Sequence, residues 1–508
     1  MKHPLLQIGI TALLLSAPLF LNAQFNLLNT GQVALQQTTN IPPAPQVDTT
    51  VALPQDNSQP WSLQQCIVYA QVHNISVQQQ QLNVEMSQAN LRLSQGNMLP
   101  SVNGFASHTY NNGRTVDRFT NTFANSTVLS ENFYLSSSVT LFSGLQNVNS
   151  VEQNKYSIQA NRFQVQQTQY DIGMNVASAY LNVLYAKEQL DVAQQQVDLT
   201  QAQVDRMQKL YDAGAQAKGA LLDLQSQLAT EEVTLVSAQN TVNISYLNLT
   251  QLMNLDSTSG FQIVKPNLVI PAQNILNTTP EQIYQIAVST MPGVKKAQMD
   301  YKSADKGVAI AYGAISPQIT LQGSLGTGYS GASKTLQNST YAGNDTIGIT
   351  TAGDYVLYPR FDNTYTTTPF GNQFNNNVNK SVGIQINIPI FNHFQTNTSI
   401  TKAKIQRENA QLSIDLSQQQ LFKNIQQAYA DAQAAFLKYQ ASQKAVDASQ
   451  ESFKYMEDKF NVGAANSIDY NNEKTKLEKA QSDLIQAKYD YVFRMKVLDY
   501  YQGIPLTF

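Results

Sequence analysis

The sequence predicts a mixed α and β membrane protein, in which a β-barrel built from several copies of the chain continues into a long helical coiled coil. Three observations lead to this fold class. Apolar residues recur every seven positions over two long stretches without proline, four short segments alternate between apolar and polar residues, and the whole order occurs twice. Sustained heptads are typical of coiled coils, and strands of about ten residues with one apolar face fit a membrane barrel.

The composition of the 508-residue chain already excludes several classes of protein. Charged residues make up 13% of the chain and the formal net charge is −3, so no strong positive field favours nucleic acid as a partner. Hydrophobic residues make up 42%, which is enough to bury a core and rules out a charged disordered chain. The polar surface is instead built on uncharged amides and hydroxyls.

The N-terminus is typical of an exported protein. Lys2 precedes an apolar stretch at 8–21, and residues 1–23 are predicted to be a signal peptide. A membrane anchor is the alternative, but the apolar stretch is short for a span of roughly 20 residues. Residues 24–61 are polar and rich in proline, as in a linker, so folded structure is expected from about Ser62.

An internal repeat divides the rest of the chain into residues 62–265 and 266–508. Each copy is predicted to hold a helix, a pair of strands and a long helical hairpin. The spacing between matching residues grows from 217 to 249, so an insertion of 32 residues falls in the polar stretch 331–380. The matching residues include Gln65 and Gln282, Pro100 and Pro317, and Gly214 and Gly463.

The first helix of each copy is expected over 62–98 and over 279–317. The only cysteine, Cys66, lies in the first of these ranges and is expected to be a small apolar residue on the helix. The long helices are predicted from heptad columns, and about 65 residues at 1.5 Å each give about 100 Å. Two half-length helices, such as 62–98 and about 219–255, would together match one long helix. The columns are Val176, Val183, Leu190, Val197, Val204 and Tyr211, and Ile425, Ala432, Tyr439, Val446, Phe453 and Phe460.

Glycine ends each long helix. Gly214 and Gly463 lie between two helical stretches, where a left-handed residue is needed to end a helix. In the second copy, Ser467 is expected to cap the following helix, and Asp469 is expected in its first turn.

Four segments are predicted to be strands with one apolar and one polar face: 101–110, 133–141, 318–325 and 381–390. A half-buried soluble sheet is the alternative. Four strands cannot close a barrel, so the chain must oligomerise; two copies would give about eight strands, and three would give about twelve with room for a lumen. The stretches 111–131 and 326–380 are expected to be outward loops.

The doubled order resembles that of the TolC-like outer membrane factor family, also called outer membrane efflux proteins, over residues 62–508. The resemblance is carried by Tyr211-Asp-Ala-Gly-Ala, Phe460-Asn-Val-Gly-Ala, Ser467-Ile-Asp469, the two prolines Pro100 and Pro317, and the closing run LIQAKYDYVFRMKVLDYYQGIPL. It implies a homotrimer with a twelve-strand outer membrane barrel, continuous with a long periplasmic coiled-coil barrel.

The same resemblance implies an exit duct in the outer membrane, belonging to a tripartite efflux pump or a type I secretion system. The implied partners are a periplasmic adaptor protein, an inner membrane transporter of RND or ABC type, and outer membrane lipid. Adaptor docking is expected at the hairpin tips, which hold Gly214, Ala215, Val462, Gly463 and Ala464. Simple turn glycines are the alternative for Gly214 and Gly463.

The resemblance also implies a narrow periplasmic entrance, at which Asp469, Phe460 and Asn472 are the candidate gate residues. A trimer would place three Asp469 carboxylates in a ring that favours cations. The sequence departs from the family at Ala465, where the family has arginine, and at Asn472 and Ala220, where it has acids. The alternative for Asp469 is a helix-start residue that interacts with the helix dipole, and the alternative for Phe460 is core packing.

An enzyme finds little support in the sequence. Gly326-Thr-Gly-Tyr-Ser-Gly331 matches a dinucleotide fingerprint, but it is expected to open a polar loop and not a helix. Outside the signal peptide the histidines are His73, His108 and His393, without metal-ligand spacing. No cofactor, metal or catalytic residue is therefore predicted. A structural or adhesive coiled-coil surface protein without channel activity is the alternative function, although it leaves the two strand pairs unexplained.

Overall fold

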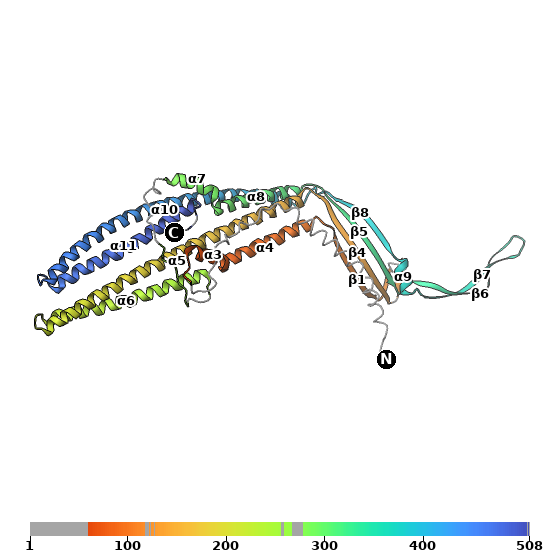
Figure 1. The fold of residues 1–508 in the computed structure, drawn as a ribbon. Helices are drawn as coiled ribbons and strands as arrows, with labels where there is room; N and C mark the ends of the chain where they lie inside the picture. The colour runs from red at the N-terminus through yellow and green to blue at the C-terminus, as the bar shows by residue number, and fades with distance from the viewer. Residues whose placement is uncertain are drawn as a thin grey trace, which may run out of the picture.

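The computed structural model of the chain describes residues 59–116, 121, 123–125, 127–255, 259–266, 278–504 and 506. The expected signal peptide, and the linker up to residue 58, lie outside the described residues. Figure 1 shows an elongated molecule with two long helical hairpins at one end, a sheet beyond them, and a narrow β-hairpin at the far end.

Two helices of 67 residues each, α5 (Gln146–Asp212) and α10 (Gln395–Asn461), give the molecule its length. At 1.5 Å per residue each is about 100 Å long, as the proline-free heptads predict. The returning helices are α6 (Lys218–Met253) and α11 (Ser467–Tyr501). The two predicted helical hairpins are therefore confirmed, and Figure 1 shows them side by side.

The helices expected over 62–98 and 279–317 are each broken once, which the sequence prediction missed. The first copy holds α3 (Leu63–His73) and α4 (Ile75–Gly96), and the second holds α7 (Pro280–Thr290) and α8 (Pro292–Gly313). The residue at each break, Asn74 or Met291, has extended backbone angles. Pro292 enforces this at Met291 because proline disfavours a helical residue before it. Asn74 caps α4 by accepting a hydrogen bond from the Ser76 amide at 2.9 Å.

Shorter helices lie end to end along each long helix, as predicted. In the first copy α3, α4 and α6 all pack against α5, and α3 meets α6. In the second copy α7, α8 and α11 pack in the same way against α10. The capping boxes at Ser62 and Thr279, with Gln65 and Gln282 as their partners, repeat the same helix start.

The largest apolar core lies where these helices meet. Trp61, Cys66, Tyr180 and Phe261 belong to it, and the Tyr180 hydroxyl donates a hydrogen bond to the Val264 carbonyl at 2.6 Å. Cys66 is fully buried on α3, which confirms its predicted place, and burial raises the pKa of its thiol to about 12. The division of the chain at residues 265 and 266 stays a prediction.

The predicted four strands form one antiparallel sheet in the order β1-β4-β5-β8. Their bounds are β1 (Ser101–Asn111), β4 (Val128–Ser143), β5 (Gln318–Ser330) and β8 (Asn379–Asn387). Strand direction alternates across the sheet, so β1 and β8 are left as its two edges within one chain.

The two faces of this sheet differ as the alternation predicts. Leu321 pairs with Val139 on one side and with Ile384 on the other, so all three share one face. On the opposite face, polar side chains bond across the strands. These bonds join Gln322 to Gln385 at 2.8 Å, Ser324 to Ser381 at 2.5 Å, and Ser101 to Ser138 at 3.1 Å.

The stretch 326–380 is not the loop that its Asn, Thr and Gly content predicts. Strand β5 continues to Ser330, and a long hairpin follows, made of β6 (Lys334–Ile349) and β7 (Tyr355–Thr367). The glycines 326 and 328 therefore lie in a strand. Tyrosine, threonine and phenylalanine pair across the hairpin and favour strands, which outweighs the loop-like composition.

Smaller elements surround this hairpin and the first strand pair. A short helix, α9 (Phe370–Asn376), joins β7 to β8. Within 111–131, also expected to be a loop, β2 (Arg114–Val116) pairs with β3 (Phe123–Asn125).

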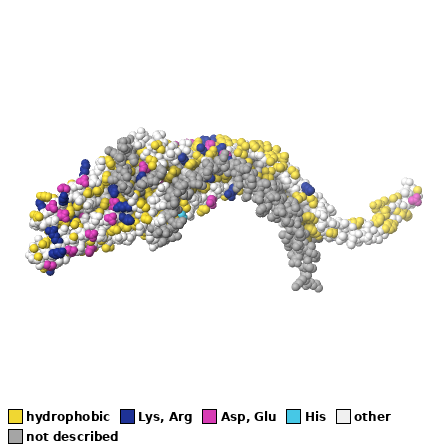
Figure 2. Space-filling model, viewed as in Figure 1, with side chains coloured by type: hydrophobic (Ala, Val, Ile, Leu, Met, Phe, Trp, Pro, Cys, Tyr) yellow, Lys and Arg dark blue, Asp and Glu magenta, His cyan; other side chains and the backbone are white. Residues whose placement is uncertain are grey.

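Charged and apolar side chains occupy different parts of the molecule. Figure 2 shows lysine, arginine and acidic side chains mainly over the long helical hairpins, and hydrophobic side chains over the sheet and the end of the β6–β7 hairpin. Within the described residues, no helix combines the length and the apolarity that a membrane crossing requires. Among those same residues, no cluster of His, Cys, Asp and Glu could hold a metal ion.

Candidate functional site: the tips of the helical hairpins

Both hairpin tips are built by the same backbone motif. Gly214 and Gly463 have positive φ angles of 70° and 75°. After Gly214, the Ala215 amide bonds the Leu210 carbonyl at 2.8 Å; after Gly463, the Ala464 amide bonds that of Lys459 at 2.8 Å. Together with the glycine amide bonds to Tyr211 and Phe460, these bonds make a Schellman motif at each tip.

All five residues predicted for adaptor docking lie exposed at the tips: Gly214, Ala215, Val462, Gly463 and Ala464. Val462 is 80% exposed, which is unusual for a valine. An added Cβ would meet nothing within 4 Å at either tip glycine. The glycines therefore serve the backbone turn, and the small surface around them is open to a partner.

The helix after the second tip starts one residue earlier than predicted. Asn466, and not Ser467, caps α11, and its side chain accepts a hydrogen bond from the Asp469 amide at 2.8 Å. An amide oxygen reaches the third amide of the helix as well as a serine hydroxyl does, so either residue fits the pattern. Asp469 lies in the first turn of α11 as predicted, and Asp469 and Asn472 are both exposed.

The two tips of one chain are held against each other. Arg206 of α5 donates hydrogen bonds to the side chain and to the carbonyl of Asn461, the latter at 3.2 Å. Ser467 lies 3.5 Å from the Asp223 carboxylate of α6. A cavity of about 460 Å³ remains between the tips and is lined by residues of both hairpins, among them Arg206 and Val462.

Phe460 packs inside this contact. It is half-buried and touches two apolar clusters, one formed by α5 and α6 and one formed mainly by α10 and α11. Its ring stacks on the buried Tyr470 with centroids 4.7 Å apart. Phe460 thus joins the two hairpins within one chain, and its expected role in narrowing a pore stays a prediction.

A buried polar network lies further along the same contact, and the sequence prediction missed it. The Lys474 ammonium of α11 lies 2.7 Å from the Glu231 carboxylate of α6, and their side chains are only 3% and 8% exposed. Thr200 of α5 donates to Glu231 at 2.6 Å and also bonds Lys474. Gln227 donates to Glu231 Oε1 at 2.9 Å, the same carboxylate oxygen that Lys474 contacts.

The heptads contained a signal for this network. Lys474 lies between Tyr470 and Leu477 in the seven-residue pattern of α11, where a coiled coil places an apolar residue. Glu231 follows the buried Leu224 by seven positions. Polar residues at matching core positions of three helices indicate a contact between those helices.

Glu478 is the second carboxylate near Lys474, at 3.5 Å. Burial raises the pKa of Glu478, and the nearby Lys474 only partly offsets this increase. The side chain lines a cavity of about 510 Å³ between the two hairpins. The network therefore carries two carboxylates for one ammonium group, and Glu478 is the carboxylate less well stabilised.

Comparison with known proteins gives this arrangement its family. The family model of outer membrane efflux proteins matches residues 66–255 and 283–498, which include all the long helices and most of both copies.

The chain belongs to the outer membrane efflux protein family.

Three solved structures share the fold of this chain. CusC has a TM-score of 0.70 and 17% identity, covering 90% of this chain and 95% of its own. VceC, an outer membrane protein from Vibrio cholerae, has a TM-score of 0.66 and 15% identity, covering 87% of this chain and 96% of its own. The CmeC outer membrane channel of Campylobacter jejuni has a TM-score of 0.66 and 14% identity, covering 87% of this chain and 85% of its own. No curated protein matches the chain.

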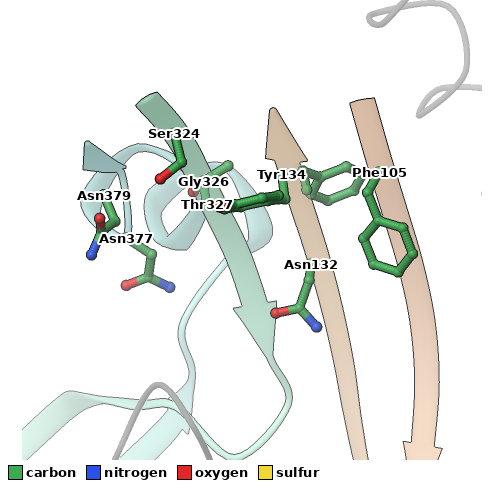
Figure 3. Close-up of a pocket in the computed structure, with 9 residues that line it drawn as sticks. Phe105, Asn132, Tyr134, Ser324, Gly326, Thr327, Asn377 and Asn379 are labelled. Carbon is green, nitrogen blue, oxygen red and sulfur yellow. The ribbon is translucent and has the colours of Figure 1, made fainter. Parts of the chain in front are cut away.

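In this outer membrane efflux protein, the sheet also carries a cavity, of about 720 Å³. Figure 3 shows Phe105, Asn132 and Tyr134 on β1 and β4, and Asn377 and Asn379 beyond β5. Asn132 and Tyr134 share the polar face of the sheet with Ser324. The cavity is lined mainly by neutral amides, hydroxyls and rings, so it offers polar contacts without a fixed charge.

Proposed function

We propose that the protein is the outer membrane exit duct of a tripartite efflux pump or a type I secretion system. It would conduct small molecules or polypeptide passively from an inner membrane transporter, of RND or ABC type, across the periplasm and the outer membrane. The observation that carries this proposal is the joining of helices about 100 Å long to an amphipathic four-stranded sheet, in a chain of the outer membrane efflux protein family.

The apolar face of the sheet supports placement in a lipid bilayer. Val382, Ile384 and Ile386 on β8 are 83%, 66% and 60% exposed. Aromatic residues gather at both ends of the four-stranded sheet, as in the aromatic girdles of membrane barrels. The cluster near the helices contains Phe391 and Phe394, and the cluster at the other end contains Phe133, Tyr329, Phe370 and Phe374.

A trimer is the assembly that we propose. The free edges β1 and β8 run in opposite directions, so copies can join edge to edge with antiparallel pairing throughout. Three copies would give about twelve strands and a lumen, whereas two would give about eight strands with a filled interior. The polar faces of the sheets would then line the lumen.

At the periplasmic end, we propose Asp469 as the residue that sets ion preference. It is exposed in the first turn of α11, and three copies around an axis would place three carboxylates at the entrance. Asn472 is exposed one helical turn further on and carries no charge. Phe460 would affect the entrance only indirectly, by fixing how the two hairpins of one chain pack.

Conductance of the purified protein in planar bilayers tests this proposal. Discrete channel openings are expected, and Asp469→Ala should weaken the preference for cations. Thr475→Ala is the matched control, because it changes an exposed neutral side chain on the same helix that is not a candidate gate residue. Failure to conduct under all conditions would instead favour the structural or adhesive coiled-coil protein.

Docking of a periplasmic adaptor at the tips is the second part of the proposal. Val462→Glu would place a charge on the exposed tip and should abolish co-purification with the adaptor encoded nearest to this gene. Val236→Glu is the control, since Val236 is 70% exposed but lies on α6 away from the tip. Equal adaptor binding by both variants would show that the tips are not the docking site.

A further inference from the structure

The β6–β7 hairpin forms a sheet of its own beyond the four-stranded sheet. In Figure 1 it leaves the end of the sheet sideways and does not continue the direction of the strands. A two-stranded ribbon alone is at best marginally stable in water. A hairpin with strands of 16 and 13 residues is therefore expected to need a surface to pack on.

The pairing of the two strands gives the hairpin an aromatic and aliphatic face. Residues that pair across a ladder point to the same side, and alternate residues of a strand share a face. The Tyr341 and Phe361 rings meet on this face with centroids 5.9 Å apart. The pairs on it include Leu336 with Tyr365, Tyr341 with Phe361, Thr346 with Leu357, and Ile349 with Tyr355.

These side chains are open to the surroundings. Tyr365, Leu357 and Phe361 are 60%, 52% and 48% exposed. Figure 2 shows that hydrophobic side chains gather at the outer end of the hairpin, where Ile349 and Tyr355 are 64% and 69% exposed. An apolar patch of this extent marks a contact surface on a folded protein.

The opposite face carries most of the hairpin's charge. Arg360 and Asp362 alternate with the aromatic face along β7, and Asp345 pairs with Tyr358 on the same side as Arg360. Arg360 lies 3.6 Å from Asp345. Arg360, Asp362 and Asp345 thus lie on one side of the hairpin, together with Val356 and Tyr358, and the aromatic and aliphatic pairs lie on the other.

The base of the hairpin lies on the apolar side of the four-stranded sheet. After β7, the Phe370 ring of α9 packs on Tyr329 at 5.7 Å and on Phe133 at 6.3 Å. Phe133 pairs with Thr327, and both Phe133 and Tyr329 share the face that holds Leu135 and Leu325. The hairpin thus starts at the aromatic cluster on the face away from the polar, lumen-facing side.

We propose that the β6–β7 hairpin lies on the lipid surface of the outer leaflet, with its aromatic and aliphatic face in the boundary between headgroups and acyl chains. This inference rests on the proposed function, because it takes the apolar face of the sheet as lipid-facing. Tyrosine mixed with aliphatic residues is typical of the membrane interface. A second copy of the hairpin is disfavoured as the covering surface, since the base lies on the side away from the lumen axis.

Tryptophan fluorescence in lipid vesicles tests this placement. In a Trp61→Phe background, Tyr365→Trp and Leu357→Trp place the only tryptophan on the proposed lipid face, near the base and near the tip. Thr364→Trp is the matched control, because Thr364 neighbours Tyr365 but points to the opposite face. The vesicles contain brominated phosphatidylcholine as the lipid quencher, and iodide is added as the aqueous quencher.

Brominated lipid is expected to reduce the fluorescence of Tyr365→Trp and Leu357→Trp by about twofold or more, as for a side chain within the interface. Thr364→Trp should respond mainly to iodide. Quenching of all three variants by iodide alone would overturn the proposal. Protection of the two lipid-face variants from both quenchers would also overturn it, and would indicate contact between hairpins.

Conductance of the same vesicles separates this inference from the proposed function. Vesicles that conduct while Tyr365→Trp is insensitive to brominated lipid would refute the lipid contact and leave the duct intact. Vesicles that do not conduct while the lipid face is quenched would refute the duct and leave the lipid contact standing.

Discussion

At the scale of single residues, the contact between the two hairpins depends on a buried ion pair. Lys474 and Glu231 are almost fully buried, and Thr200 and Gln227 satisfy the remaining positions around Glu231. A buried pair of this kind contributes little net stability compared with apolar packing, but removal of one partner leaves a charge without compensation. The network thus determines how the three helices pack against each other, and adds little to the free energy of unfolding.

Lys474→Met is expected to lower the free energy of unfolding by about 3–5 kcal/mol, because Glu231 would remain buried without its cation. Lys476→Met should cost at most about 1 kcal/mol, since Lys476 pairs with Glu473 at the surface. The double variant Lys474→Met with Glu231→Met should recover most of the loss. Urea unfolding of the purified protein measures all three, and equal costs for Lys474→Met and Lys476→Met would contradict the prediction.

Glu478 predicts a pH dependence of stability. Its pKa in the folded protein is raised above the ordinary value of 4.5, so the folded chain binds this proton more tightly than the unfolded chain. The contribution of Glu478 to stability therefore falls as pH rises from about 4.5 through the raised pKa, and stays constant above it. Glu478→Gln should remove this fall. The free energy of unfolding of the variant should therefore rise relative to that of the wild type as pH increases.

Glu473→Gln provides a control of opposite sign. Hydrogen bonds from Lys476 and Ser452 lower the pKa of Glu473, so the wild type gains stability from this group above about pH 4.5. The free energy of unfolding of Glu473→Gln should therefore fall relative to that of the wild type as pH increases. Free energies of unfolding between pH 4 and pH 8 measure both, and the same trend for the two variants would count against the assignment.

At the scale of elements, the helical hairpins follow closely from the sequence and the shorter elements do not. Heptads and glycines predict α5, α10 and both tips, because packing every seven residues and a left-handed turn residue are local requirements. The break at Met291 also has a local cause in Pro292. The break at Asn74 is only partly local: its side chain caps α4, but it also donates a hydrogen bond to the distant Leu252 carbonyl at 3.1 Å.

Gly214→Ala and Gly463→Ala are each expected to destabilise their tip by roughly 1–2 kcal/mol, because a side chain disfavours positive φ. Gly219→Ala is the control: Gly219 lies in α6 without a positive φ or a close neighbour, and alanine there should stabilise by up to about 1 kcal/mol. Amide hydrogen exchange at the tips measures the change. Faster exchange in Gly219→Ala than in Gly214→Ala would contradict the prediction.

At the scale of the whole molecule, the two sheet edges determine how copies assemble. Asn103→Cys on β1, combined with a cysteine at 381, 383, 385 or 387 on β8, tests edge-to-edge pairing on the polar face. Oxidation should link copies into dimers and trimers and no larger species, because a ring of three has no free edge. Cys66 is fully buried and should not react. Ladders beyond the trimer would show open assembly and contradict a closed barrel.

The matched control for this experiment is Asn103→Cys with a cysteine at 384, which places the second thiol on the apolar face of β8. Thiols on opposite faces of a sheet cannot meet. Efficient linking by this control would show that the cross-links arise from random collisions between copies.

The sequence by itself determined the repeat, the long helices, the tips, the four strands and the two faces of the sheet. Each of these depends on local periodicity or on the conformation of one residue, and both are written in the chain. The tertiary structure alone decided that Lys474, Glu231 and Thr200 meet, since they come from three helices separated by up to 274 positions. It also decided that the stretch 334–367 forms a hairpin, because the pairing of β6 with β7 outweighs a composition typical of loops.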